Sequence, residues 1–85
     1  MKKDMRQKTE TLKQYEVYGY QIAYYLLENE RLAMQASIQA LMELINDEEF
    51  FRQPQPLQKL KAAKVFMRQS IQVRKCNLQK MDQPS

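Results

Sequence analysis

The sequence predicts an all-α fold, a small three-helix bundle in which an αα-hairpin packs against a long basic C-terminal helix. Gly occurs once and Pro three times in 85 residues, so turns are few and helices are favoured over a sheet. Apolar residues recur at steps of three and four in three stretches, near residues 11–27, 30–45 and 57–80. A chain of this length holds one small core. We therefore expect residues 1–85 to form a single helical domain.

The first expected helix covers residues 11–27. Residues 1–10 are polar and charged, which predicts a frayed N-terminus, and Thr9 or Thr11 can cap the helix. Gly19 costs roughly 1 kcal/mol inside a helix relative to Ala, so we expect a close helix crossing there. Most of the five tyrosines are expected in the core or at an interface. The apolar stripe contains Leu12, Tyr15, Gly19, Ile22 and Leu26, flanked by Tyr18 and Tyr25.

The second expected helix covers residues 30–45, with Asn29 as its N-cap. Two sides of this helix are apolar, so it is either buried on both or buried on one and docked on the other. Small residues on one side let a neighbouring backbone approach closely. The larger stripe contains Met34, Ser37, Ile38, Leu41, Met42 and Ile45, and the small one contains Ala33, Ala36 and Ala40.

Residues 46–56 are expected to form a loop with a short turn that holds Phe50 and Phe51. One of these rings would close the end of the bundle, and the other is a weaker candidate for a partner contact. Pro54 and Pro56 break regular structure before the third helix. Residues 82–85 are expected to be a polar tail. The inner stripe expected for the third helix is Leu57, Leu60, Ala63, Phe66, Met67, Ile71, Arg74, Leu78 and Met81.

Charge is distributed in blocks. Net charge is +3 over residues 1–13, −5 over 14–53 and +6 over 54–85, which gives the total of +4. The C-terminal block places Lys61, Lys64, Arg68 and Lys75 near one line of the third helix. Such a line can contact a phosphate backbone. Alternatively, it is a solvated face that balances the acidic helices beside it.

Several classes of function lack the residues they need. The chain has no His, one Cys and no Gly-rich loop, so the usual catalytic triads, zinc sites and phosphate-binding loops are unavailable. We expect no enzyme activity, no catalytic residue, no metal and no cofactor. No apolar run reaches the roughly 20 residues that cross a bilayer, and the start lacks a secretory signal. A cytoplasmic protein with no membrane partner is expected, and the single Cys76 agrees with a reducing compartment.

The helical pattern resembles the second conserved region of bacterial sigma factors of the extracytoplasmic-function type. Residues 19–27 are similar to the family's Tyr-x-x-Ala-Tyr-x-x-Leu helix, and residues 28–44 to the acidic turn and helix that follow. Residues 57–80 resemble the promoter-reading helix, with Phe66-Met67-Arg68 near its aromatic and basic cluster. The likeness covers residues 12–80. It implies a subunit that binds RNA polymerase and helps contact promoter DNA.

The sequence also departs from the family pattern. Met34-Gln35 and Ile38-Gln39 stand where the family has acidic and Gln-Glu pairs that bind the polymerase clamp helices, and Ile45 replaces a usual Trp. The aromatic candidates for holding a melted strand are reduced to Phe50, Phe51 and Phe66. A second domain for the upstream promoter element is missing from these 85 residues. The resemblance therefore implies a truncated or split stand-alone domain. It is either one half of a split sigma factor that works with a separate sigma-like partner, or a divergent relative that has kept the fold for binding protein.

Two hypotheses follow. In the first, the chain is a transcription subunit that docks on polymerase through the second helix and touches DNA through Lys61, Lys64, Arg68 and Lys75. The polymerase-binding residues would be Gln35, Ile38, Gln39 and Met42. In the alternative, the chain is a helical protein-interaction or regulatory module, or a homodimer, that never binds DNA. Six methionines in so short a chain favour adaptable packing at such a surface.

Overall fold

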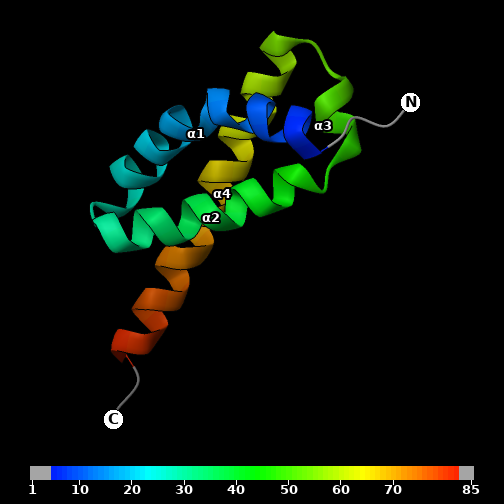
Figure 1. Ribbon diagram of the computed structural model, residues 1–85. Helices are drawn as coiled ribbons and strands as arrows, with labels where there is room; N and C mark the ends of the chain where they lie inside the picture. The colour runs from blue at the N-terminus through cyan, green and yellow to red at the C-terminus, as the bar shows by residue number, and fades with distance from the viewer. Residues whose placement is uncertain (1–4, 83–85) are drawn as a thin grey trace.

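The computed structural model describes the backbone of residues 5–82 and the side chains of residues 6–77, and the only regular secondary structure in this part of the chain is α-helix. Four helices follow one another, as Figure 1 shows: α1 (Met5–Leu27), α2 (Glu30–Ile45), α3 (Glu48–Arg52) and α4 (Gln55–Asp82). The predicted small all-α bundle is confirmed. The three long helices are those expected from the sequence, and the short α3 lies inside the stretch expected to be a loop.

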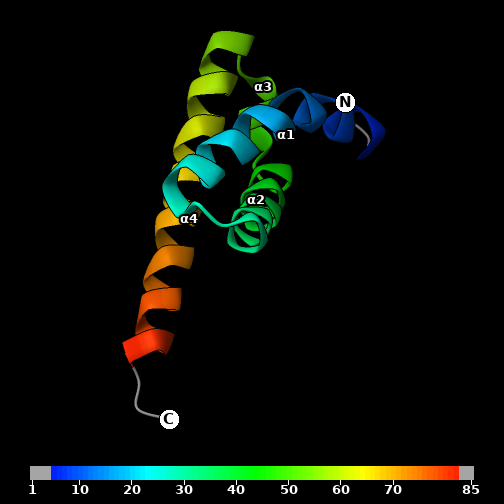
Figure 2. The same ribbon diagram turned by 90° about the vertical axis from the view of Figure 1, so that its left-hand side faces the viewer.

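The helices form a hairpin crossed by one long helix. α1 and α2 run antiparallel to each other, and α4 passes across both of them on one side (Figures 1 and 2). The N-terminal half of α4 packs in the bundle, whereas its C-terminal end extends beyond α1 and α2 in both views. The molecule is correspondingly elongated, with extents of 52 × 20 × 17 Å.

The turn between α1 and α2 is set by two residues. Glu28 adopts a left-handed conformation with φ of 52°, and its N–H donates to the carbonyl of Tyr24 over 2.7 Å. Asn29 caps α2 as predicted, because its side-chain oxygen accepts from the N–H of Leu32 over 3.0 Å. The chain therefore reverses within two residues and places α2 against α1.

The start of α1 differs from the sequence prediction. The helix begins at Met5, so residues 5–10 are helical rather than frayed, and residues 1–4 lie outside the described range. Neither expected threonine caps the helix. Thr11 instead sits within it and donates its hydroxyl to the carbonyl of Gln7 over 3.0 Å. At the other end, α4 continues to Asp82, and residues 83–85 of the expected polar tail are outside the description.

The core is built on small residues where the helices cross. Ala33, Ala36 and Ala40 of α2 are fully buried, as the alanine pattern predicted. Gly19 of α1 is also buried, and a methyl group added there would lie 2.3 Å from Cζ of Phe66 in α4. The predicted close crossing is therefore confirmed, and its partner is the ring of Phe66.

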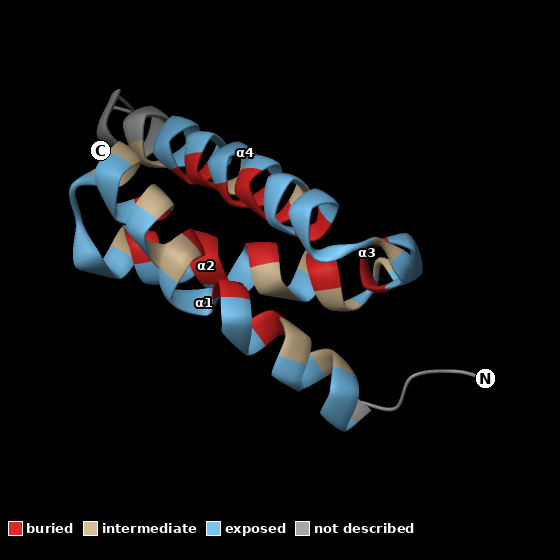
Figure 3. Cartoon of the chain, turned by 90° about the horizontal axis from the view of Figure 1, so that it is seen from above, coloured by how far each residue is buried: buried red, intermediate tan, exposed pale blue. Residues whose placement is uncertain are grey.

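Several large apolar residues of α2 and α4 point outward. For α2 this agrees with the alternative in which the helix is buried on one side and accessible on the other, whereas for α4 it differs from the prediction. In α2, Met34, Ile38 and Met42 are exposed, because the helix turns its alanines toward the bundle. In α4 the predicted inner stripe is only partly correct, because Ala63 and Phe66 are buried but most of its other described members are exposed. The side chains of Leu78 and Met81, which also belong to that stripe, lie outside the described residues. The exposed members of the predicted inner stripe are Leu57, Leu60, Met67, Ile71 and Arg74, and the buried side chains of α4 are Gln58, Ala62, Ala63, Val65, Phe66, Ser70 and Val73. Figure 3 shows this division of α4 into a buried and an exposed side.

A buried series of hydrogen bonds joins α1, α4 and α3. The hydroxyl of Tyr15 donates to Oε1 of Gln58 over 3.0 Å, and Nε2 of Gln58 donates to the carbonyl of Phe50 over 3.1 Å. Burial raises the pKa of Tyr15 above its ordinary value. Phe50 and Phe51 are both buried, so the expectation that one of them contacts a partner is wrong. The other tyrosines are less buried than expected, and Tyr24 and Tyr25 are exposed.

Candidate functional site

One candidate site is the outward face of α2. Gln35, Ile38, Gln39 and Met42, the four residues predicted to bind a partner, are all exposed. Their spacing of three and four residues places them on one side of the helix. Ile38 and Met42 expose 50% and 61% of their surface, which leaves two large apolar side chains in contact with water. The sequence prediction thus selected residues that share an accessible face.

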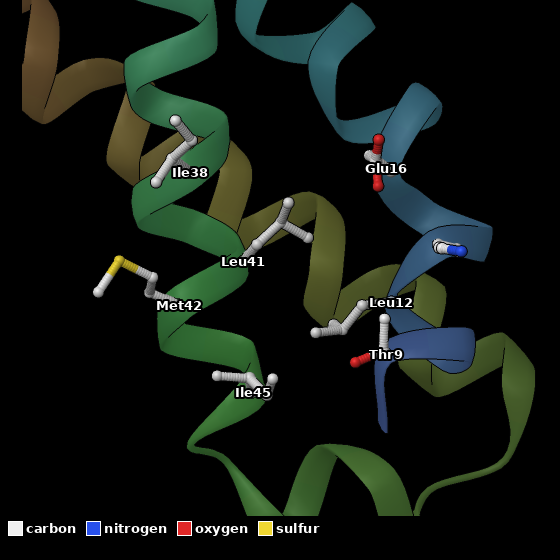
Figure 4. A pocket seen from close by; sticks show the side chains of 8 residues that line it. Thr9, Leu12, Glu16, Ile38, Leu41, Met42 and Ile45 are labelled. Carbon is white, nitrogen blue, oxygen red and sulfur yellow. The ribbon is translucent and has the colours of Figure 1, made fainter. Parts of the chain in front are cut away.

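An apolar groove runs beside this face, between α1 and α2 and away from α4. At one end, a pocket of about 280 Å³ is lined by Leu12 and Lys13 of α1 and by Leu41, Met42 and Ile45 of α2, among others. Figure 4 shows Leu41 of α2 and Leu12 of α1 pointing toward one another across the pocket, whereas Met42 points away from α1. A second pocket of about 420 Å³ continues the groove toward the hairpin turn. The two pockets share Glu16, Ile38 and Leu41.

The groove also contains an unsatisfied polar group. Ser37 lines the second pocket and is only 5% exposed. Within the described part of the chain its hydroxyl has no hydrogen-bond partner. Ser70 of α4, by contrast, donates to the carbonyl of Phe66 over 2.7 Å. A buried hydroxyl without a partner is costly, and a bound molecule that supplied a partner would remove this cost.

The basic line on α4 is divided between paired and unpaired residues. Lys61 contacts Asp47, the N-cap of α3, over 3.3 Å, and Arg68 forms an ion pair with Glu43 of α2. Both acids lie in the acidic block identified from the sequence. Two of the four predicted phosphate contacts therefore balance neighbouring acids, as the alternative explanation required.

The other two basic residues are exposed on the outer side of α4. Lys64 and Lys75 form no ion pair with any other residue that the structure describes. They lie 11 positions apart, about three helical turns. Only these two members of the predicted line are free to contact an external anion without first breaking an internal pair.

The aromatic residues proposed for holding a melted strand are not accessible. Phe50, Phe51 and Phe66 are exposed by 4% or less and pack in the main core cluster. Phe51 additionally lies beneath the ammonium group of Lys8, 5.5 Å from the ring centroid. These three rings build the bundle, and none can stack on a nucleobase without unfolding it.

Sequence reasoning missed one exposed apolar set because it assigned these residues to the core. Leu57, Leu60, Met67 and Ile71 form a stripe on the outer side of α4. The sequence does contain a pattern that indicates this exposed stripe. Its residues are spaced by three and four positions, as in a helix–helix seam, and Lys64 occupies the central position of the series. A cation in the middle of a stripe indicates an accessible face.

Metal-ligating side chains do not cluster on either face within the described part of the chain. Among the described residues, no three His, Cys, Asp or Glu side chains gather in a way that could hold a metal ion. Cys76 is exposed and free. Within the same range, none of the helices has the length and apolar character required to span a membrane. The accessible chemistry of these two faces is apolar contact, hydrogen bonding by side-chain amides, and positive charge.

Comparison with protein-family models, with curated proteins and with solved structures found no match to this chain.

Proposed function

We propose that the chain is a protein-docking subunit that binds a larger assembly through the outward face of α2. Following the resemblance to sigma factors, the proposed assembly is RNA polymerase, joined by a separate sigma-like partner. The observation that carries the proposal is the opposite character of the two sides of α2. Its alanine side is fully buried, whereas Gln35, Ile38, Gln39 and Met42 on the other side remain accessible.

The composition of this face suits a protein partner. Exposed Ile and Met side chains gain free energy when they leave water, and Met adapts its shape to irregular surfaces. The two glutamines can supply hydrogen bonds at the rim, where they stay partly solvated. The adjoining groove adds a concave apolar surface, and its wall contains the hydroxyl of Ser37, which has no hydrogen-bond partner among the described residues.

The test is capture of purified bacterial RNA polymerase core enzyme by the tagged chain. Ile38→Glu and Met42→Glu should each abolish capture, because an unpaired carboxylate is costly inside an interface. Both positions are at least half exposed in the free chain, so helicity should not change. Tyr25→Glu is the matched control, since Tyr25 is 82% exposed at the far end of α1. Undiminished capture by the α2 variants would refute this docking face.

A contribution to promoter DNA contact is the second part of the proposal. It is supported by Lys64 and Lys75, which are exposed and unpaired among the described residues. Replacing both with Gln should reduce the slope of log affinity against log salt by roughly 2, from about 0.9 per phosphate contact. Lys61→Gln with Arg68→Gln is the comparison, because these two residues are already paired with Asp47 and Glu43. The assay uses promoter DNA with and without polymerase.

A second candidate function is a protein-interaction module that binds no DNA. Two observations favour it: half of the basic line pairs with internal acids, and the three phenylalanines are buried. If this candidate is correct, the chain retains partner capture while the lysine variants leave DNA association unchanged in both formats. Binding of polymerase together with a salt-dependent DNA contact would exclude it.

A further inference from the structure

The outer side of α4 carries a continuous apolar stripe that the proposed function does not use. Leu57, Leu60, Met67 and Ile71 recur at the three-and-four spacing of a helix–helix seam, and their exposed fractions lie between 41% and 53%. The stripe spans about 21 Å along the helix, at 1.5 Å per residue. In Figure 3 this side of α4 is turned away from both α1 and α2.

Positive charge accompanies the stripe along its whole length. Lys64 stands within it, and Lys75 continues the line toward the C-terminus. Between residues 53 and 81 the sequence holds seven Lys or Arg residues and no Asp or Glu. Lys61 and Arg68, on the edge nearest α2, are paired with acids of α2 and the α3 cap. Any molecule that covers the stripe must therefore face cations that α4 itself cannot neutralise.

From these features we infer that α4 binds an acidic amphipathic helix of a partner protein along this stripe. Apolar residues of the partner cover Leu57, Leu60, Met67 and Ile71, and a carboxylate pairs with Lys64 in the middle of the seam. A second carboxylate near the C-terminal end meets Lys75. A charged residue at a central seam position fixes the register of two helices, so this arrangement selects one alignment.

Charge complementarity separates this occupant from two others. A second copy of the same stripe would bring like charges face to face along the seam, which is unfavourable. Proteins that bind single-stranded nucleic acid combine a basic groove with aromatic side chains that stack on the bases. The only aromatic residue of α4, Phe66, is fully buried, so this face lacks the stacking component. An acidic helix satisfies both the apolar and the basic components of the surface.

This inference does not depend on the α2 docking face, because the stripe is on a different helix and faces away from the groove. It adds a second binding surface and specifies the chemistry of its partner. If an acidic helix and DNA both use Lys64 and Lys75, their binding is mutually exclusive. The partner helix would then control whether the basic face is available.

The experiment uses the full chain and two synthetic helical peptides of about three heptads. Both carry Leu at the seam positions; one carries Glu at the flanking positions and the other carries Lys. Binding is measured by fluorescence anisotropy at low and high salt. The Glu peptide should bind and weaken with salt, whereas the Lys peptide should bind at least tenfold more weakly, because its charges repel those of α4.

Two pairs of substitutions separate the electrostatic and apolar contributions. Lys64→Glu with Lys75→Glu should reverse the preference in favour of the Lys peptide. Leu60→Asn with Ile71→Asn should weaken the Glu peptide by roughly tenfold or more if the two side chains are central contacts. Both pairs are on exposed positions, so far-UV circular dichroism should be unchanged. Gln21→Glu on the exposed side of α1 is the matched control and should bind the Glu peptide as the parent does.

Three outcomes would overturn the inference. Equal binding of both peptides would show that charge does not select the occupant. Dimerisation in sedimentation analysis that is abolished by Ile71→Asn would assign the stripe to a second copy. Tighter binding of a single-stranded oligonucleotide than of the Glu peptide, lost in the lysine variants, would assign it to nucleic acid.

Discussion

Replacing Gly19 by Ala tests the helix crossing on which the whole bundle depends. In an isolated helix this substitution is stabilising by roughly 1 kcal/mol, since Gly has the higher conformational entropy when unfolded. In this bundle the added methyl group would lie 2.3 Å from Cζ and 2.4 Å from both Cε atoms of Phe66. Carbon atoms pack at about 3.5 to 4.0 Å. The ring must therefore move by more than about 1 Å, or α1 and α4 must separate.

The ring has little room to move because Phe66 is fully buried and belongs to the main core cluster. Overpacking a filled core costs typically 1 to 3 kcal/mol. Subtracting the gain in helix propensity leaves a net loss of up to about 2 kcal/mol for Gly19→Ala. For a chain of this size, each kcal/mol lowers the melting temperature by roughly 4 to 8 °C.

A double-mutant cycle makes the test independent of these absolute values. Phe66→Leu shortens the side chain that meets Gly19, so in this background Gly19→Ala should become neutral or stabilising by up to about 1 kcal/mol. The free energies of unfolding of the four variants are measured by urea denaturation, followed by far-UV circular dichroism. If Gly19→Ala stabilises the parent chain, or if its effect is the same in both backgrounds, the close contact with Phe66 does not exist.

Further expectations concern the polar groups of the bundle. Ser37→Ala should raise the free energy of unfolding by about 1 kcal/mol, since it removes a buried hydroxyl without a partner, and it should weaken partner capture if the groove's occupant bonds to that hydroxyl. Tyr15→Phe should cost about 1 to 3 kcal/mol because Oε1 of Gln58 loses its donor. The raised pKa of Tyr15 means that the folded state retains its proton more strongly, so the parent loses stability as pH rises above 10.0 and Tyr15→Phe lacks this part of the loss. Asn29→Ala should cost about 1 kcal/mol by removing the cap of α2, measured by thermal denaturation.

The sequence was sufficient to locate the long helices because their apolar spacing and terminal signals agree. The cap at Asn29, the buried alanines of α2 and the close approach at Gly19 all follow from local side-chain chemistry. The start of α1 could not be placed, since the polar residues before residue 11 can extend a helix as readily as they can fray. In the structure these residues are helical, and Lys8 among them forms an ion pair with Glu48 of α3, a contact distant in sequence.

The faces of α4 were harder to predict because the helix is amphipathic in two directions. One stripe contains Ala62, Val65, Phe66 and Val73, and the other contains larger aliphatic residues such as Leu60. Hydrophobicity alone favours the second stripe, whereas close packing against the alanines of α2 requires the first. Tertiary geometry decided between them. One residue in the sequence did indicate the correct face, because Lys64 lies within the stripe that is exposed. Ser70 gave no such help, since it is polar but lies within the buried stripe.

The same packing choice explains why the candidate docking site is on α2. A helix that approaches its neighbours through Ala33, Ala36 and Ala40 brings the backbones together but buries little side-chain area at those positions. Its larger residues, Ile38 and Met42, are then directed to the opposite side, where no helix of the described chain covers them. A single bundle of this size can bury only a limited core. Binding of a partner over α2 would bury these side chains and stabilise the folded chain by mass action, so the melting temperature should rise with the concentration of a true partner and remain constant for Ile38→Glu.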